Sequence, residues 1–168
     1  MELHINAEKV LKNNIEIMYW ELEKAIKTYI KEGHYMGELK YVNAYLCATI
    51  NSIVAYVERL IKAQRLEEDD IVQALKYVNN LQKHNPQLVS VPKAVGGFCF
   101  PLVFTDSFRI PEINIVWDDC IGLDTKKASQ KDCYEKYFKQ RGIIDTLKPI
   151  VVILLNTEGT ISFKEIMS

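Results

Sequence analysis

Apolar residues recur every three or four positions along the first part of the chain, which is the period of one face of an α-helix. The first stripe is formed by Leu11, Ile15, Met18, Leu22, Ala25 and Tyr29. Polar residues fill the positions between them. Asn6 is a favourable N-cap and Gly33 a favourable stop, so the pattern predicts an amphipathic helix between these two residues.

Two further helices follow with the same period. The second begins near Gly37, and its stripe is formed by Leu39, Val42, Leu46, Ile50, Ile53, Val57 and Leu60. The third begins after Arg65, because the acidic residues at positions 67–70 complement the positive end of a helix dipole. Asn85 and Pro86 are expected to end it, since the residue before a proline is disfavoured in helical conformation.

Residues 88–118 have a different pattern. Short apolar or β-branched runs are separated there by prolines and glycines, which predicts strands and turns. A fourth helix is expected to begin near Ser129. The apolar run at positions 150–155 fits either a buried strand or a buried helix, and we favour a helix that is kinked or restarted at Pro149. The tail after Gly159 is expected to be a strand or coil.

These elements predict a single, mainly α domain that spans residues 1–168. The expected architecture is an up-and-down helical bundle of about four helices, with a small antiparallel β insertion at about residues 88–118 before the last helix. A chain of 168 residues is long enough to bury such a core without disulfides or a structural metal.

Composition narrows the classes of function. The formal net charge is −1, so there is no global basic field, and any contact with a nucleic acid needs a local patch. The four cysteines show no C-x-x-C spacing, which argues against a zinc site. The first residues lack the features of a signal peptide, and the longest apolar run is short for a membrane span. We therefore predict a cytoplasmic protein without membrane contact, cofactor or metal.

Candidate chemistry gathers at the end of the third predicted helix. Helical spacing places Lys76, Asn80, Lys83 and His84 on one face. An imidazole can transfer protons near neutral pH, and lysines can hold a phosphate. A histidine at this position can instead stabilise the negative end of the helix dipole and cap its carbonyls. Both interpretations of His84 are open at this stage.

This string resembles the motif of the HEPN superfamily (higher eukaryotes and prokaryotes nucleotide-binding), in which an arginine and a polar residue precede a histidine late in a helix. Asn79 stands at the arginine position, Asn80 at the polar position and His84 at the histidine position. The resemblance covers the helical arrangement over about residues 5–85 and 130–157. It implies a homodimer, RNA or a nucleotide as ligand, and a bacterial defence or toxin–antitoxin setting.

The sequence departs from this motif at Asn79, because RNA-cleaving members resemble one another in using the arginine together with the histidine. Asn79 cannot supply a fixed positive charge. The resemblance therefore implies a binding or protein-interaction module rather than an enzyme, with Lys76, Asn79, Asn80 and Lys83 as binding residues.

Two alternatives remain. One is a metal-independent endoribonuclease that uses His84 as its catalytic acid or base at a dimer interface. The other is a structural or interaction protein without a substrate, whose β insertion presents phenylalanines to a partner. Those side chains are Phe98, Phe100, Phe104 and Phe108.

Overall fold

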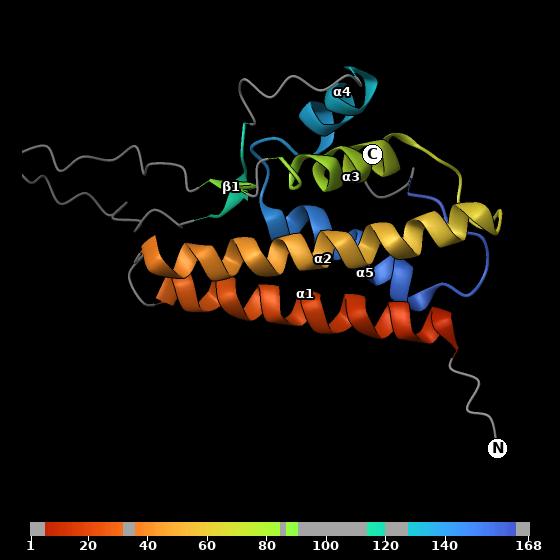
Figure 1. Cartoon of the computed structure of the whole chain (residues 1–168), viewed down its shortest axis with the longest axis horizontal. Helices are drawn as coiled ribbons and strands as arrows, with labels where there is room; N and C mark the ends of the chain where they lie inside the picture. Colours follow the sequence, from red (N-terminus) through yellow and green to blue (C-terminus); the bar gives the residue numbers. More distant parts are fainter. Residues whose placement is uncertain (1–5, 32–35, 85–86, 91–113, 120–127, 164–168) are drawn as a thin grey trace, which may run out of the picture.

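The computed structural model describes residues 6–31, 36–84, 87–90, 114–119 and 128–163, with only the backbone described at 36–38 (Figure 1). Its elements confirm the predicted mainly α class with a small antiparallel sheet. In chain order they are α1 (Ala7–Lys31), α2 (Met36–Lys62), α3 (Asp70–Leu81), β1 (Val89–Ser90), β2 (Val116–Trp117), α4 (Ala128–Tyr137) and α5 (Ile143–Asn156).

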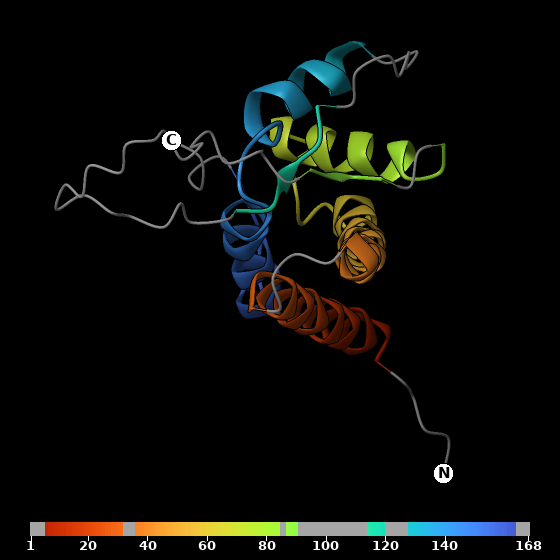
Figure 2. The same cartoon turned by 90° about the vertical axis from the view of Figure 1, so that its left-hand side faces the viewer.

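The first four helices lie on one another in chain order. Figure 2 shows α1, α2, α3 and α4 as successive layers, with α5 along one side of the stack. The long helices α1 and α2 pack closely against each other, α3 packs between α2 and α4, and α5 contacts α1. This order leaves α1 at the lower edge of the molecule in Figure 1, with one face turned away from the other helices.

Capping side chains mark the starts of α1 and α3, and the cap at Asn6 confirms the prediction. Asn6 Oδ1 accepts hydrogen bonds from the backbone N–H groups of Glu8 and Lys9, at 3.0 and 3.3 Å. Asp69 Oδ1 accepts from Ile71 N and Val72 N, both at 3.0 Å. Each cap satisfies N–H groups that have no partner inside their own helix.

Helix α2 is the central helix of the bundle, and six of its seven predicted stripe residues are buried, with Leu39 partly so. Its segment Leu39–Lys62 is long and apolar enough in composition to span a membrane, and 44% of its most apolar stretch is buried in the fold. A core helix meets the same criteria, so this is weak evidence for a membrane span. The absence of membrane contact stays a prediction.

The two strands form an antiparallel pair that joins the ends of the predicted insertion. Val89 pairs with Trp117 and Ser90 with Val116. Asn43 of α2 anchors the entry to β1, because its Oδ1 accepts a hydrogen bond from Leu88 N at 2.8 Å. Residues 91–113, which include the four candidate phenylalanines, lie outside the described residues.

Trp117 is the centre of an aromatic cluster that connects β2 to α3 and α4. Its ring lies 5.1 Å from that of Phe138 and 6.5 Å from that of Tyr134, measured between centroids. Tyr134 in turn lies 5.2 Å from Tyr77 of α3. All four rings are buried. The short sheet is therefore held by side-chain packing rather than by its few hydrogen bonds.

The second half of the chain contains two helices where the sequence analysis placed one. After α4 ends at Tyr137 the chain turns through Gln140, whose φ is 58°, and α5 begins at Ile143. Ile143 N donates to Ile115 O at 3.1 Å, and Trp117 N donates to Arg141 O at 3.1 Å. These hydrogen bonds to the β2 segment thus determine where the chain is interrupted between α4 and α5.

Helix α5 confirms the helical interpretation of residues 150–155, but it does not restart at Pro149. Pro149 lies inside the helix and removes one backbone hydrogen-bond donor. Complete burial of Ile150 and Leu154 offsets this loss, because each removes a large apolar side chain from water.

The segment after α5 returns to the connection between α2 and α3. Ile161 forms a single parallel bridge with Leu66, and Ile161 N donates to Arg65 O at 2.7 Å. The side chains of Ile161 and Phe163 are buried. The predicted strand or coil is therefore a coil with one bridge, and it contributes to the core.

Candidate functional site

The site predicted at the end of α3 is only partly assembled. The helix ends at Leu81, earlier than expected, and the chain tightens into a turn in which Lys83 N donates to Asn80 O at 3.2 Å and His84 N to Leu81 O at 3.0 Å. Lys83 and His84 are exposed, and Asn80 is half-buried. His84 therefore lies in the turn after α3 and not in the helix itself.

The other two predicted residues contact neighbouring side chains. Lys76 forms an ion pair with Glu68, in the turn before α3. Asn79 Oδ1 accepts a hydrogen bond from Gln82 Nε2 at 2.7 Å, and Gln82 Nε2 also donates to Asn51 Oδ1 at 2.5 Å. Asn79 thus belongs to an amide network between α3 and α2. These contacts compete with any ligand for Lys76 and Asn79.

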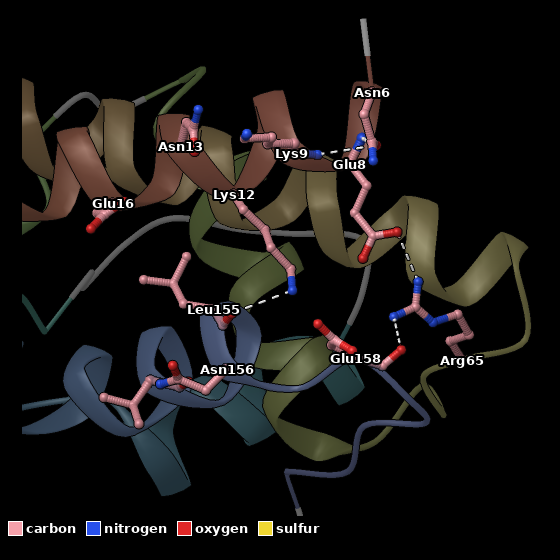
Figure 3. A pocket seen from close by; sticks show the side chains of 11 residues that line it. Asn6, Glu8, Lys9, Lys12, Asn13, Glu16, Arg65, Leu155, Asn156 and Glu158 are labelled. Carbon is pink, nitrogen blue, oxygen red and sulfur yellow. Dashed lines mark hydrogen bonds and ion pairs between the residues drawn. The ribbon is translucent and has the colours of Figure 1, made fainter. Parts of the chain in front are cut away.

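A cleft of about 620 Å³ lies between the start of α1, the end of α5 and Arg65 (Figure 3). Arg65 connects its walls: Nη1 contacts Glu8 Oε2 at 2.9 Å, and Nη2 donates to Glu158 O at 2.7 Å. Lys12 Nζ donates to the carbonyls of Leu155 and Thr157, both at 3.3 Å. The charged groups of Lys12 and Arg65 therefore bind oxygen atoms of the protein itself and connect the helices around the cleft. We call these contacts the Arg65 clasp.

The contacts of the Arg65 clasp set the protonation states of Glu8 and Tyr56. Tyr56 Oη donates to Glu8 Oε1 at 2.8 Å. That hydrogen bond, together with Arg65, lowers the pKa of the Glu8 carboxyl. Burial and the nearby Glu8 carboxylate raise the pKa of Tyr56 to about 12. At neutral pH the carboxylate is therefore ionised and the phenol protonated, which is the pairing that the geometry requires.

Replacing Glu8 with glutamine is expected to lower the free energy of unfolding at pH 7 by roughly 1 kcal/mol, because the half-buried pair with Arg65 is lost. The folded pKa of Glu8 lies below the unfolded one, so this contribution is complete above the ordinary value of 4.5 and is lost as the pH falls through the folded value. Urea titrations of both proteins at pH 7 and about pH 3.5 measure this. Glu16→Gln, on an exposed position of the same helix, is the control. A stability difference that does not shrink in acid would contradict the assignment.

The outward face of α1 carries a different set of side chains. Trp20, Lys24, Lys27 and Lys31 are spaced by four, three and four residues, which places them on one helical face, and all are exposed. We call these residues, together with Lys40 and Tyr41 at the start of α2, the lysine–aromatic surface. The exposed fraction is 57% for Trp20 and 53% for Tyr41.

A lysine ammonium group lies over each exposed aromatic ring of this surface. Lys24 Nζ lies 5.1 Å from the centroid of the Trp20 ring, and Lys40 Nζ lies 5.0 Å from that of Tyr41. These distances fit cation–π contacts, which are weak at exposed positions. The ammonium groups are therefore held near the rings but can move to another anionic partner.

Two neighbouring hollows make the surface continuous between α1 and α2. One, of about 340 Å³, is lined by Trp20, Glu23, Lys24, Lys27, Thr28 and Lys31. The other, of about 270 Å³, is lined by Glu21, Lys24, Ala25, Thr28, Tyr41 and Tyr45. Lys24 and Thr28 line both hollows, so an elongated ligand can contact both aromatic rings.

Positive charge dominates this surface. Among the described side chains, its four lysines outnumber the two carboxylates that line the hollows, Glu21 and Glu23. The pair between Lys27 Nζ and Glu23 Oε2 is long, at 3.9 Å, and the Lys27 side chain is 78% exposed. A pair this exposed contributes little, so Lys27 is available to an anionic ligand.

This surface was not predicted, because Lys24 and Lys27 are among the polar residues between the apolar positions of α1 and such residues usually form the solvated face of an amphipathic helix. The four residues of α1 were visible as a helical spacing. The exposure of Trp20 and Tyr41 could not be predicted from the sequence, since an aromatic residue is more often buried than exposed.

No family model, curated protein or solved structure matches this chain.

Proposed function

We propose that this protein is an RNA-binding module and that the lysine–aromatic surface is its contact site. The observation that carries the proposal is Trp20, which is more than half exposed at the head of a row of three lysines on the outward face of α1. Leaving an indole in water is unfavourable, and a row of ammonium groups attracts a polyanion. RNA supplies both partners, since it has phosphates for the lysines and aromatic bases for the rings.

The charge of the chain is compatible with this proposal. With a net charge of −1, the protein has no overall attraction for a polyanion, so the binding energy must come from this local patch. Contacts between lysines and phosphates release counterions, which makes the affinity strongly dependent on salt. The expected behaviour is moderate affinity that weakens steeply as salt is added.

The proposal keeps the ligand class implied by the HEPN resemblance but moves the site from α3 to the α1–α2 hairpin. It favours binding over cleavage, because Asn79 lies in an amide network and supplies no positive charge beside His84. A bacterial defence or toxin–antitoxin setting is carried over from the resemblance alone. Lys83 and His84 serve as the comparison site in the test.

The triple variant Lys24→Gln, Lys27→Gln and Lys31→Gln is expected to bind a labelled single-stranded RNA of about 12 nucleotides at least tenfold more weakly than the wild type. Fluorescence anisotropy over a series of salt concentrations measures this. The slope of log affinity against log salt should fall in magnitude by about 2, because three lysine–phosphate contacts are removed.

Two control variants decide whether the location matters. Lys9→Gln, Lys62→Gln and Lys148→Gln remove the same charge at exposed positions away from the surface, and they should change binding little. Lys83→Gln with His84→Gln tests the end of α3. Equal losses in both triple variants, or loss of binding in the α3 variant alone, would exclude the lysine–aromatic surface as the site.

A further inference from the structure

We infer that the lysine–aromatic surface selects single-stranded over duplex RNA, because it binds by stacking unpaired bases on Trp20 and Tyr41. The inference rests on the proposed function and adds that the bound RNA is single-stranded. In a duplex the faces of the bases are covered by their neighbours, and only the phosphate backbone can reach the lysines. In a single strand a base can leave its stack and lie on an exposed ring.

The placement of the rings supports stacking. Trp20 and Tyr41 are each more than half exposed, on α1 and α2 respectively. Each lines one of the two neighbouring hollows, and Lys24 lines both. The space beside each ring is therefore open to a planar group, and a cation lies between the two positions.

The lysines over the rings couple stacking to phosphate binding. In the free protein the ammonium groups of Lys24 and Lys40 lie about 5 Å from the ring centroids, within the range of a cation–π contact. A base that stacks on the same ring face displaces the ammonium group. The released lysine has a flexible four-carbon stem and can reach a phosphate of the same strand.

The lysine–aromatic surface is long enough to contact several consecutive nucleotides of an RNA strand. Trp20 and Lys31 are eleven residues apart on α1, which corresponds to about 16 Å along the helix axis. Lys24 and Lys27 lie between them on the same face. A base on Trp20 can thus be followed by several backbone contacts toward Lys31.

The chain offers a direct optical test. It contains two tryptophans, and Trp117 is completely buried. Titration with a single-stranded RNA of about 12 nucleotides should therefore quench Trp20 and leave Trp117 unchanged. A hairpin duplex with the same number of phosphates should bind at least tenfold more weakly and quench little. Trp20→Phe keeps a ring for stacking but should show no quenching.

Affinity measurements with Trp20→Ala complete the test. This variant should bind the single strand roughly 5- to 100-fold more weakly, whereas Trp20→Phe should lose no more than about threefold. Because Trp20 is exposed, its replacement should leave the urea midpoint unchanged, which confirms that the variant is folded.

Three outcomes are decisive. A preference for the single strand that is lost with Trp20→Ala supports the inference. Equal affinity for both RNAs, with Trp20→Ala unchanged and the lysine triple variant weakened, overturns base stacking but leaves the proposed function in place. If the wild type binds neither RNA even at low salt, both the inference and the proposed function are wrong.

Discussion

Replacing Trp117 with alanine is expected to lower the free energy of unfolding by about 3–5 kcal/mol, the usual loss for a large buried aromatic side chain. Trp117 is completely buried and contacts the rings of Tyr134 and Phe138. It also lies in β2, whose only partner among the described strands is the two-residue β1. Alanine at this position would leave a cavity between β2 and the rings of Tyr134 and Phe138. Because these rings are themselves buried, we expect them to fill the cavity only in part.

Trp117→Phe is the matched control for this prediction. The indole Nε1 is buried and has no hydrogen-bond partner among the described residues. Phenylalanine keeps most of the ring and removes this unpaired donor, so its loss should stay below about 1.5 kcal/mol. Urea unfolding followed by far-UV circular dichroism measures both variants. Similar losses for alanine and phenylalanine would mean that the ring does not connect the sheet to α4.

The helices of the first half could be predicted because their signals are local. Apolar periodicity marks the buried face of α1 and α2, and the caps at Asn6 and Asp69 use side chains within three residues of the N–H groups they accept. The antiparallel pair at the two ends of the β insertion was also predictable, since short apolar or β-branched runs lie at both ends of residues 88–118. Each of these features can be recognised in a window of a few residues.

The break between α4 and α5 could not be predicted in the same way. Gly142, the N-cap of α5, is a local signal for a break, but nothing marks Gln140 itself, whose left-handed backbone is unusual for a residue other than glycine. Long-range hydrogen bonds from Trp117 and Ile143 fix this segment. Pro149 was the conspicuous local signal, yet burial of the residues around it outweighs its effect. Tertiary contacts therefore decided where the helix begins.

The candidate site shows the same limit. The spacing that grouped Lys76, Lys83 and His84 assumed that α3 continues to Pro86, but the chain turns after Leu81. On α1 the spacing of the lysines was visible from the sequence. Its meaning depended on Trp20 being exposed, which is decided by the stacking order of the helices and not by any local pattern.

Phe163→Ala is expected to lower the free energy of unfolding by about 3–5 kcal/mol, although the residue lies in a coil after the last helix. The ring is completely buried, and Ile161 beside it is bridged to Leu66 in the connection between α2 and α3. Arg65, next to Leu66, holds the same segment through the carbonyl of Glu158. The coil thus connects α5 to the α2–α3 connection, and removing the ring would open the core at this point.

Thr160→Ala provides the control, because Thr160 is exposed in the same coil, and its effect should stay within about 0.5 kcal/mol. Urea titrations distinguish two ways in which Phe163→Ala can act. If the coil belongs to the cooperative core, the midpoint falls and the dependence on urea stays unchanged. If the coil unfolds by itself, the dependence on urea falls because less surface is exposed in the main transition. An unchanged midpoint would show that the Phe163 ring is not needed for the stability of the helices.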